Sequence, residues 1–240
     1  MSTEASPTGF LVAPAAPIQS ASSLRSRVTV LAVVLAVGAI VSAAFSIWHP
    51  EPDANDEFGY SVMAPIRTSW WAWHVLGGLG TAVLAISLGL AVCLLAPRRG
   101  AAWATGGAIV TSLGGLAFLG AMGAEAVLGY YVTDTDALPV DTGTNFISYV
   151  NDNFAQLGVM LFPGFMLLGL GGLLLAVALW RAGSVPRWSV VAFAVTNLAG
   201  AVLPFGVVAD VVNTVFFATI LALAWFVWKS VAGVRLTVEG

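Results

Sequence analysis

The sequence predicts an all-α, polytopic membrane protein with six transmembrane helices and both termini in the cytoplasm. Of its 240 residues, 59% are hydrophobic and 9% are charged, whereas soluble domains carry roughly 25% charged residues. The mean hydropathy is +0.93, and several apolar runs reach about 18 residues, enough to span a hydrocarbon layer about 30 Å thick. These observations exclude an ordinary soluble domain. Nine basic residues and a net charge of −3 also provide no positive surface for nucleic acid.

Six apolar segments are expected to cross the bilayer as helices, because a helix satisfies its own backbone hydrogen bonds in lipid. They are residues 28–47, 70–96, 101–131, 156–180, 188–208 and 211–228, within a transmembrane domain of residues 25–235. Residues 1–24, rich in Ser, Ala and Pro, are expected to form a disordered cytoplasmic tail. Residues 48–69 and 132–155 are expected to form acidic external loops.

The basic residues predict the orientation. Eight of the nine lie at one end of the expected spans, and only Arg67 lies at the other. The eight are Arg25, Arg27, Arg98, Arg99, Arg181, Arg187, Lys229 and Arg235. Basic loops stay in the cytoplasm, so both termini are expected there and the protein is expected in the plasma membrane. The first segment also has the three parts of a signal peptide, but its apolar run exceeds the usual length of 7 to about 15 residues, so cleavage stands as an alternative.

Small residues at four-residue spacing predict how helices pack. Gly77, Thr81, Ala85, Gly89 and Cys93 form such a stripe in the second span, and Gly107, Thr111 and Gly115 form another in the third. Small residues allow close backbone packing in lipid. We therefore expect the two spans to form a tight antiparallel hairpin through these stripes.

Two further local features are expected. Pro163, which cannot donate a backbone hydrogen bond, should kink the fourth span. Phe146, Val150 and Phe154, with Ile147 beside them, repeat at helical spacing and predict a short amphipathic helix at the outer interface.

Common catalytic signatures are absent from the sequence. It contains no phosphate-binding glycine loop ending in Lys-Ser or Lys-Thr, no His-Glu-x-x-His and no Gly-x-Ser-x-Gly. Asp141-Thr142-Gly143 matches the short signature of aspartic proteases, but that chemistry needs a second aspartate, so a loop turn is preferred. Cys93, the single cysteine, is interpreted as a small buried hydrophobe.

Three ionisable residues are expected at one level near the outer boundary of the hydrocarbon. At 1.5 Å per helical residue, His74, Glu125 and Asp210 lie roughly 33, 36 and 27 Å above the inner ends of their spans. His74 and Glu125 share the bearing of the small-residue stripes, which turns both into the bundle. Structural roles are the alternative, because side chains at this depth can reach water, and Asp210 is placed to cap the last helix.

The expected pocket also includes His49, Arg67 and Asn213, which lie near the same level. Arg67, the one external base, is expected to pair with Glu125 or Asp210. Thr196 and Asn197 fall about 12 to 14 Å above Trp188, near the midplane. There an asparagine is expected to bond a neighbouring helix, with the lining of a polar path as the alternative.

The turn Leu179-Trp-Arg-Ala-Gly-Ser-Val-Pro-Arg-Trp188 resembles the inner turn of uncharacterised six-span bacterial membrane proteins of domain-of-unknown-function families. The resemblance covers this turn and the general layout. It implies a six-span fold and provides no catalytic residues.

These features favour a non-enzymatic membrane protein with an outward-facing polar pocket for binding, sensing or small-solute passage. One alternative is a membrane metalloenzyme or redox protein that uses the outer His and carboxylate residues, including a haem on an external histidine. The other is a structural subunit that grips a partner through its small-residue stripes. No cofactor and no defined metal site are predicted. The expected partners are the lipid bilayer and either a second copy of the chain or another membrane protein.

Overall fold

The computed structural model describes residues 21–48, 59–202 and 207–232, and the secondary structure of these residues is helical. The elements are α1 (Ala21–Ile47), α2 (Tyr60–Met63), the 3-10 helix η1 (Ala64–Ile66), α3 (Arg67–Leu95), α4 (Ala101–Val132), α5 (Val140–Asp152), α6 (Ala155–Ala182), α7 (Arg187–Val202) and α8 (Val207–Ala232).

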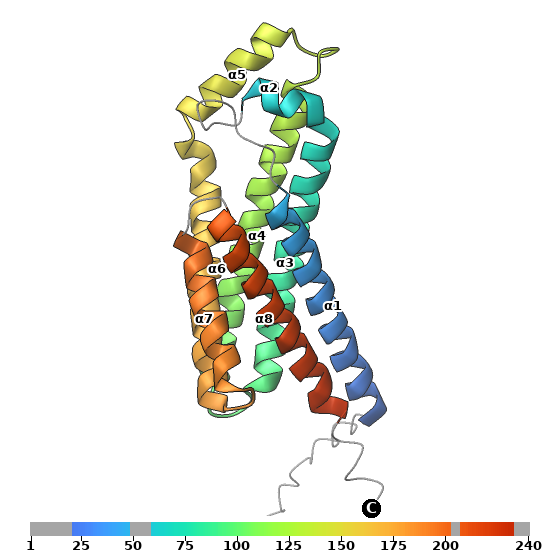
Figure 1. The fold of residues 1–240 in the computed structure, drawn as a ribbon, viewed down its shortest axis with the longest axis vertical. Helices are drawn as coiled ribbons and strands as arrows, with labels where there is room; N and C mark the ends of the chain where they lie inside the picture. Colours follow the sequence, from blue (N-terminus) through green and yellow to red (C-terminus); the bar gives the residue numbers. More distant parts are fainter. Residues whose placement is uncertain (1–20, 49–58, 203–206, 233–240) are drawn as a thin grey trace, which may run out of the picture.

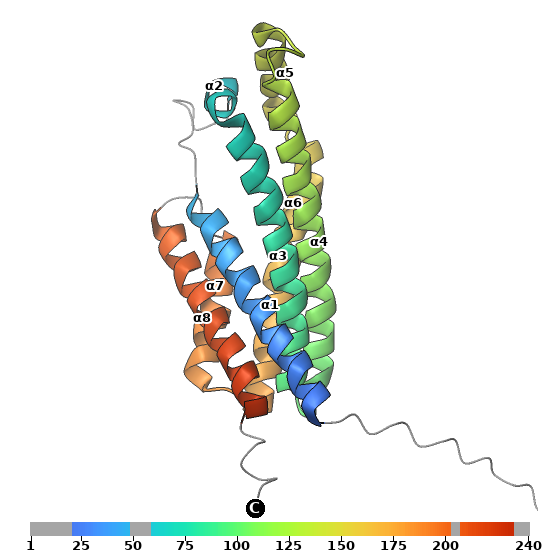
Figure 2. The same ribbon diagram turned by 90° about the vertical axis from the view of Figure 1, so that its right-hand side faces the viewer.

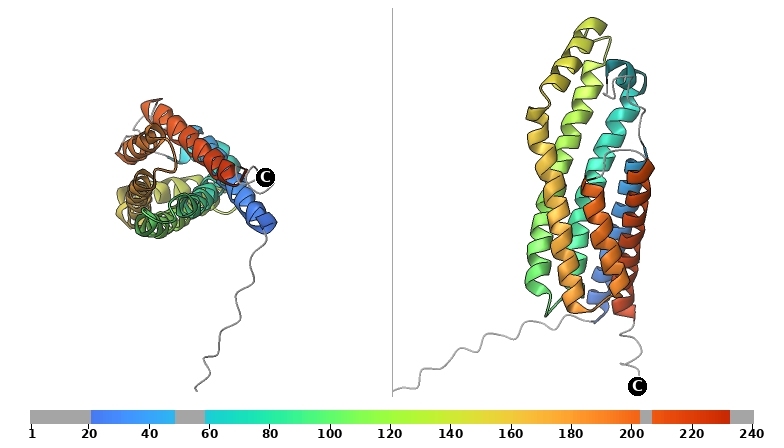
Figure 3. Two further views of the ribbon diagram at one scale, coloured as in Figure 1. Left: turned by 90° about the horizontal axis from the view of Figure 1, so that it is seen from below. Right: turned by 60° about the vertical axis from the view of Figure 1, so that its left-hand side comes forward.

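The six longer helices α1, α3, α4, α6, α7 and α8 form a bundle in which each packs beside the next. α1 packs on α3, α3 on α4, α4 on α6, α6 on α7, α7 on α8, and α8 returns to α1. Figures 1 and 3 show this arrangement, with the start of α1 and the end of α8 at one end of the bundle. The helix order along the chain therefore closes into a ring.

Five stretches are long and apolar enough to cross a membrane: Ser23–Ile47, Tyr60–Leu95, Ala101–Val132, Leu161–Ala182 and Val207–Ser230. The described part of the remaining long helix, α7, has 16 residues. These lengths and compositions support a multi-pass membrane protein.

Several expected boundaries differ from the structure. Residues 21–24, assigned to the disordered tail, begin α1, and residues 1–20 lie outside the described part. Val207 and Val208, assigned to the fifth span, begin α8. The two expected external loops contain the helices α2, η1 and α5. Apolar composition alone does not reveal where one helix stops and the next begins when both sides of the turn are apolar.

The expected hairpin of α3 and α4 is present, and small residues bring the two helices together. A Cβ added at Gly115 would lie 2.7 Å from Cβ of Ala85, and one added at Gly89 would lie 2.8 Å from Cα of Ala108. Gly77, however, faces Phe45 of α1. Four residues rotate about 400° around the helix axis, which is about 40° more than one full turn. The stripe therefore winds around α3 and faces one neighbouring helix at one end and another neighbouring helix farther along.

The stripe on α4 was wrongly assigned entirely to this hairpin. Gly107 packs against Leu175 of α6, and Thr111 packs against Gly171 of α6. α4 therefore presents small residues to α3 and to α6 on different faces. Pro163 lies inside α6, and the adjacent Gly164 packs against Phe118 of α4.

Short helices close the bundle at the end opposite the described termini (Figures 1 and 2). We call α2, η1, α5 and residues 133–139 the cap. A cluster of buried apolar side chains, here called the cap cluster, joins the cap to α3 and α4. It consists of Met63, Trp70, Val132 and Ile147, with Trp48, Tyr60, Ile66 and Leu128 packed against it.

The amphipathic helix expected near residue 146 is α5, which ends at Asp152, before Phe154. Ile147 is 3% exposed, whereas Phe146 is 45% exposed. Gly143, one turn before Ile147, packs against the ring of Tyr60 and the carbonyl of Val132. The close approach at a glycine therefore selects the buried face, and this face lies one position away from the phenylalanine.

Candidate functional site

His74 and Glu125 meet below the cap, as their common depth predicts. His74 lies two turns into α3 and Glu125 about two turns before the end of α4. Nε2 of His74 is 3.5 Å from Oε2 of Glu125. The His74 side chain is 9% exposed and that of Glu125 is 21% exposed, so the pair is largely enclosed but not sealed.

The hydrogen bond on the other side of the imidazole fixes one of its hydrogens. Nδ1 of His74 lies 2.8 Å from the backbone carbonyl oxygen of Trp70. A carbonyl oxygen accepts and cannot donate, so Nδ1 carries a hydrogen. When the pair holds a proton, Nε2 faces Glu125 either as the second N–H of an imidazolium or as the acceptor of a hydrogen from the carboxylic acid, and that proton lies between Nε2 and Oε2. When the pair has lost this proton, two acceptor atoms face each other.

Aromatic rings surround the imidazole on the remaining sides. Trp70 stacks on His74 with ring centroids 4.2 Å apart. Phe45 of α1 and Trp48, which follows α1, make T-shaped contacts with the imidazole, with ring centroids at 5.8 Å and 6.3 Å. These rings exclude water from the imidazole, and the face of the stacked Trp70 ring attracts an imidazolium, as the Glu125 carboxylate does.

Arg67 was wrongly expected to pair with Glu125 or Asp210. Its Nη1 lies 2.8 Å from Oδ1 of Asp134, just after α4, and its guanidinium stands over the ring of Tyr130 at 4.9 Å. The hydrogen bond from Arg67 lowers the pKa of the Asp134 carboxyl below its ordinary value of 3.8, helped by the backbone N–H of Asp136. This ion pair connects the start of α3 to residues 133–139 of the cap, one to two helical turns above His74.

The remaining described pocket candidates, Asp210 and Asn213, lie on α8. Asp210 is half-buried in the first turn of α8, and its backbone carbonyl accepts a hydrogen bond from Thr214. α8 packs mainly on α1 and α7. Asn213 faces α7, since a Cβ added at Gly200 would lie 3.2 Å from its Oδ1. His49 lies outside the described residues.

The two midplane residues make structural contacts. Nδ2 of Asn197 donates to the carbonyl of Gly169 at 2.9 Å, joining α7 to α6 as expected for an asparagine in lipid. Oγ1 of Thr196 donates within its own helix, to the carbonyl of Ala192 at 2.7 Å. The hydrogen-bonding groups of both side chains are therefore engaged in holding helices.

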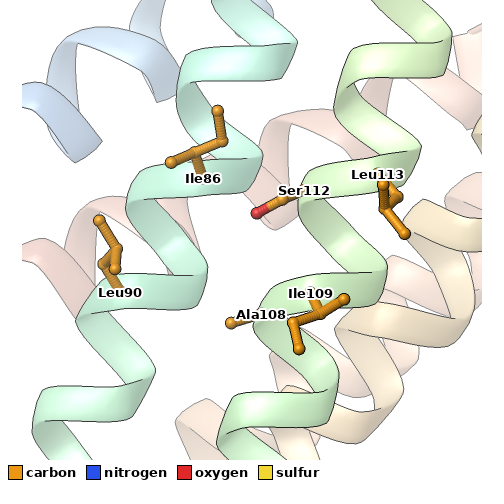
Figure 4. Close-up of a pocket in the computed structure, with 6 residues that line it drawn as sticks. All are labelled: Ile86, Leu90, Ala108, Ile109, Ser112 and Leu113. Atoms are coloured by element: carbon orange, nitrogen blue, oxygen red, sulfur yellow. The ribbon is translucent and has the colours of Figure 1, made fainter.

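A groove lies between α3 and α4 and is lined by side chains of both helices (Figure 4). It has a volume of about 320 Å³ and is lined by Ile86, Leu90, Ala108, Ile109, Ser112 and Leu113. Ile86 is twelve residues, about 18 Å of helix, from His74. The apolar lining and the exposure of its larger side chains make it part of the lipid-facing surface, separate from the polar site.

Within the described ranges, no three side chains of His, Cys, Asp or Glu gather as ligands for a metal ion. His74 and Glu125 alone offer one nitrogen and one carboxylate toward the space between them. This geometry is suited to proton exchange.

Sequence reasoning missed Trp70 as part of the site, because a tryptophan near the end of a span is typical of a membrane anchor. Trp70 is 5% exposed, and its Nε1 donates to the backbone carbonyl of Glu125 at 3.3 Å. Its position one helical turn before His74 was the available signal, since side chains four residues apart meet on one helix face.

A comparison with family models, with curated proteins and with solved structures finds no match to this chain.

Proposed function

We propose that this chain is a non-enzymatic, multi-pass protein of the plasma membrane that senses protons at its outer face through His74 and Glu125. The observation that carries the proposal is the pair itself, with Nε2 and Oε2 at 3.5 Å and Nδ1 bound to a carbonyl. An unperturbed histidine changes charge between pH 5 and about 8. A pair that holds one proton in an enclosed aromatic setting is therefore suited to respond to external acidity.

The position of the pair supports an outward-facing site. From Leu95 to His74 the helix rises about 31 Å, and from Ala101 to Glu125 about 36 Å. Both distances match the thickness of the hydrocarbon core, about 30 Å. The pair then lies at the boundary farthest from two turns that the positive-inside rule assigns to the cytoplasm. The turn at 96–100 contains Arg98 and Arg99, and the turn at 183–186 is flanked by Arg181 and Arg187.

The alternatives of a metalloenzyme and a structural subunit have less support. A metal centre would need ligands beyond His74 and Glu125. The subunit hypothesis rested on free small-residue stripes, but Gly89, Gly107 and Gly115 pack against helices of the same chain. Proton sensing, in contrast, uses the polar contact that the bundle encloses.

The test is a one-sided titration of His74 in vesicles. The chain has two histidines, so a His49→Gln variant labelled with ¹³C at the histidine Cε1 gives one imidazole signal by NMR. We expect that signal to titrate when the pH on the outer side of oriented vesicles is varied with a membrane-impermeant buffer. Glu125→Gln should displace the titration, and Asp141→Asn, which alters an exposed carboxylate on α5, should not.

A His74 signal that is constant between pH 5 and about 8, or one that follows only the pH inside the vesicles, would overturn the proposal.

A further inference from the structure

We propose that Trp70 couples the proton shared by His74 and Glu125 to the docking of the cap helix α5, so that α5 is held down when the proton is bound and released when it is lost. This inference rests on the proton-sensing function proposed above. It adds the element that responds and the direction of the response.

Trp70 belongs to the site and to the cap at once. On one side its ring stacks on His74, its carbonyl accepts from Nδ1 of His74, and its indole N–H donates to the backbone of Glu125. On the other side it belongs to the cap cluster, which also contains Met63 and, from α5, Ile147. The site and the cap therefore cannot move independently of this residue.

The Trp70 ring has little freedom on its α4 side. A Cβ added at Gly129 would lie 2.6 Å from Cδ1 and Nε1 of the indole, so the ring already rests on the glycine backbone. A shift of the ring away from α4 is directed toward the residues that surround it in the cap cluster. Displacement at His74 is thus transmitted to Met63 and Ile147.

Loss of the proton provides the displacement. With Nδ1–H bound to Trp70, a neutral His74 presents the lone pair of Nε2 to Glu125. If Glu125 is then a carboxylate, two acceptors face each other at a distance that a shared hydrogen had bridged. The contact turns from attractive to repulsive, and separation of the two side chains relieves it.

The charged groups on the elements around His74 determine which of them can respond to its protonation. α4 contributes Glu125, and α3 itself contributes Arg67, which is paired with Asp134 of the cap. Phe45 of α1 and Trp48, which follows α1, present uncharged rings to His74. α8, which also contacts α3, carries Asp210 in its first turn. Glu125 is the ionisable side chain that the structure places against Nε2.

The cap helix is attached weakly enough to respond. The buried residues of α5 are Gly143 and Ile147, while Val140, Phe146 and Tyr149 are each at least 45% exposed. Elements with few buried contacts open at low free energy. Weakening the Ile147 contact removes the one buried apolar side chain that anchors this helix.

The experiment is hydrogen exchange of residues 140–152, followed by mass spectrometry on the full chain in nanodiscs. It is carried out at one pH below and one pH above the His74 titration measured by NMR. Glu125→Gln is the matched control at each pH: its amide N–H can donate to unprotonated Nε2, so the contact persists without a shared proton. Comparing both proteins at the same pH cancels the intrinsic effect of pH on exchange rates.

Below the titration we expect equal exchange in the two proteins, and above it we expect residues 140–152 of the wild type to exchange several-fold faster than those of Glu125→Gln. If the ratio of the wild-type exchange rate to the Glu125→Gln exchange rate is the same at both pH values, in a protein whose His74 does titrate, the coupling is overturned and proton sensing stays intact. A His74 that does not titrate overturns both proposals. Trp70→Phe provides a further arm, with the two pH values chosen around the His74 titration measured in that variant. The exchange of residues 140–152 should no longer depend on the protonation of His74, and a persistent dependence would overturn the role of Trp70.

Discussion

Trp70 lies against His74 with their ring centroids 4.2 Å apart and their planes at 28°, while its own carbonyl oxygen is 2.8 Å from Nδ1 of the same histidine. The two contacts constrain each other, because rotation of the imidazole to break the hydrogen bond would also break the stack. His74 is therefore held with Nε2 directed at Glu125. The orientation of the candidate site follows from a residue one helical turn away on the same helix.

Close packing between α3 and α4 predicts a large cost for one added methyl group. Gly115→Ala places a Cβ 2.7 Å from Cβ of Ala85, and overpacking of this kind destabilises by about 1 to 3 kcal/mol. Gly106→Ala on the same helix meets nothing within 4 Å and should stabilise by up to about 1 kcal/mol, as alanine does over glycine in a helix. Unfolding free energies in bicelles test this pair, and equal effects of the two substitutions would contradict the packing described here.

The hydrogen bond from Asn197 to α6 predicts a smaller loss. Asn197→Ala removes the 2.9 Å bond to the carbonyl of Gly169, and interhelical bonds in membranes contribute about 0.6 to 2 kcal/mol. Thr196→Val is the control, because its hydroxyl bonds within α7 and valine has nearly the same shape. The same unfolding measurement applies. A greater loss for Thr196→Val than for Asn197→Ala would show that the midplane contact has been misassigned.

The Arg67–Asp134 ion pair predicts a dependence of stability on acid. The pKa of Asp134 is lowered in the folded protein, so the pair stabilises the fold above pH 3.8, the ordinary pKa, and this contribution disappears as the pH falls through the lowered pKa. The pair is solvent-exposed, so the effect should be modest. The melting temperature of the wild type should exceed that of Asp134→Asn at pH 6 and converge with it near pH 2, whereas Asp152→Asn should show no such difference. Persistence of the difference at pH 2 would argue against the ion pair as its source.

The distribution of basic residues predicts the sidedness of the bundle. In a Cys93→Ala background, Asp141→Cys on α5 should react with a membrane-impermeant thiol reagent added to intact cells, because α5 is expected outside. Ser184→Cys, exposed in the turn between α6 and α7, should react only after the cells are opened. The reverse pattern would invert the topology and place the His74 site at the cytoplasmic face.

The helical class and the meeting of His74 with Glu125 could be predicted from the sequence, because apolar length identifies helices in lipid and helical rise converts residue counts into depth. Neighbour relationships were harder to predict. Depth placed Arg67, Glu125 and Asp210 at similar levels, but it contains no information about which helices are adjacent. The partner of Arg67 is Asp134, which follows α4 and stands beside the start of α3.

The buried face of α5 could not be predicted for a related reason. Phe146 and Ile147 are neighbours on the helix surface and similarly apolar, so hydrophobic spacing alone does not choose between them. The contact of Gly143 with Tyr60 decides the choice, and a contact between segments far apart in the sequence cannot be predicted from local periodicity.

The central claim is that His74 holds a fixed hydrogen on Nδ1 and exchanges its other proton at Nε2 with Glu125, and ¹⁵N NMR of the imidazole in the His49→Gln variant tests it most directly. We predict that Nδ1 stays protonated from pH 5 to about 9, a range that brackets histidine titration. The chemical shift of Nε2 should change with pH, and Glu125→Gln should displace the pH at which it changes. A neutral His74 that keeps its hydrogen on Nε2, with Nδ1 unprotonated, would contradict the claim.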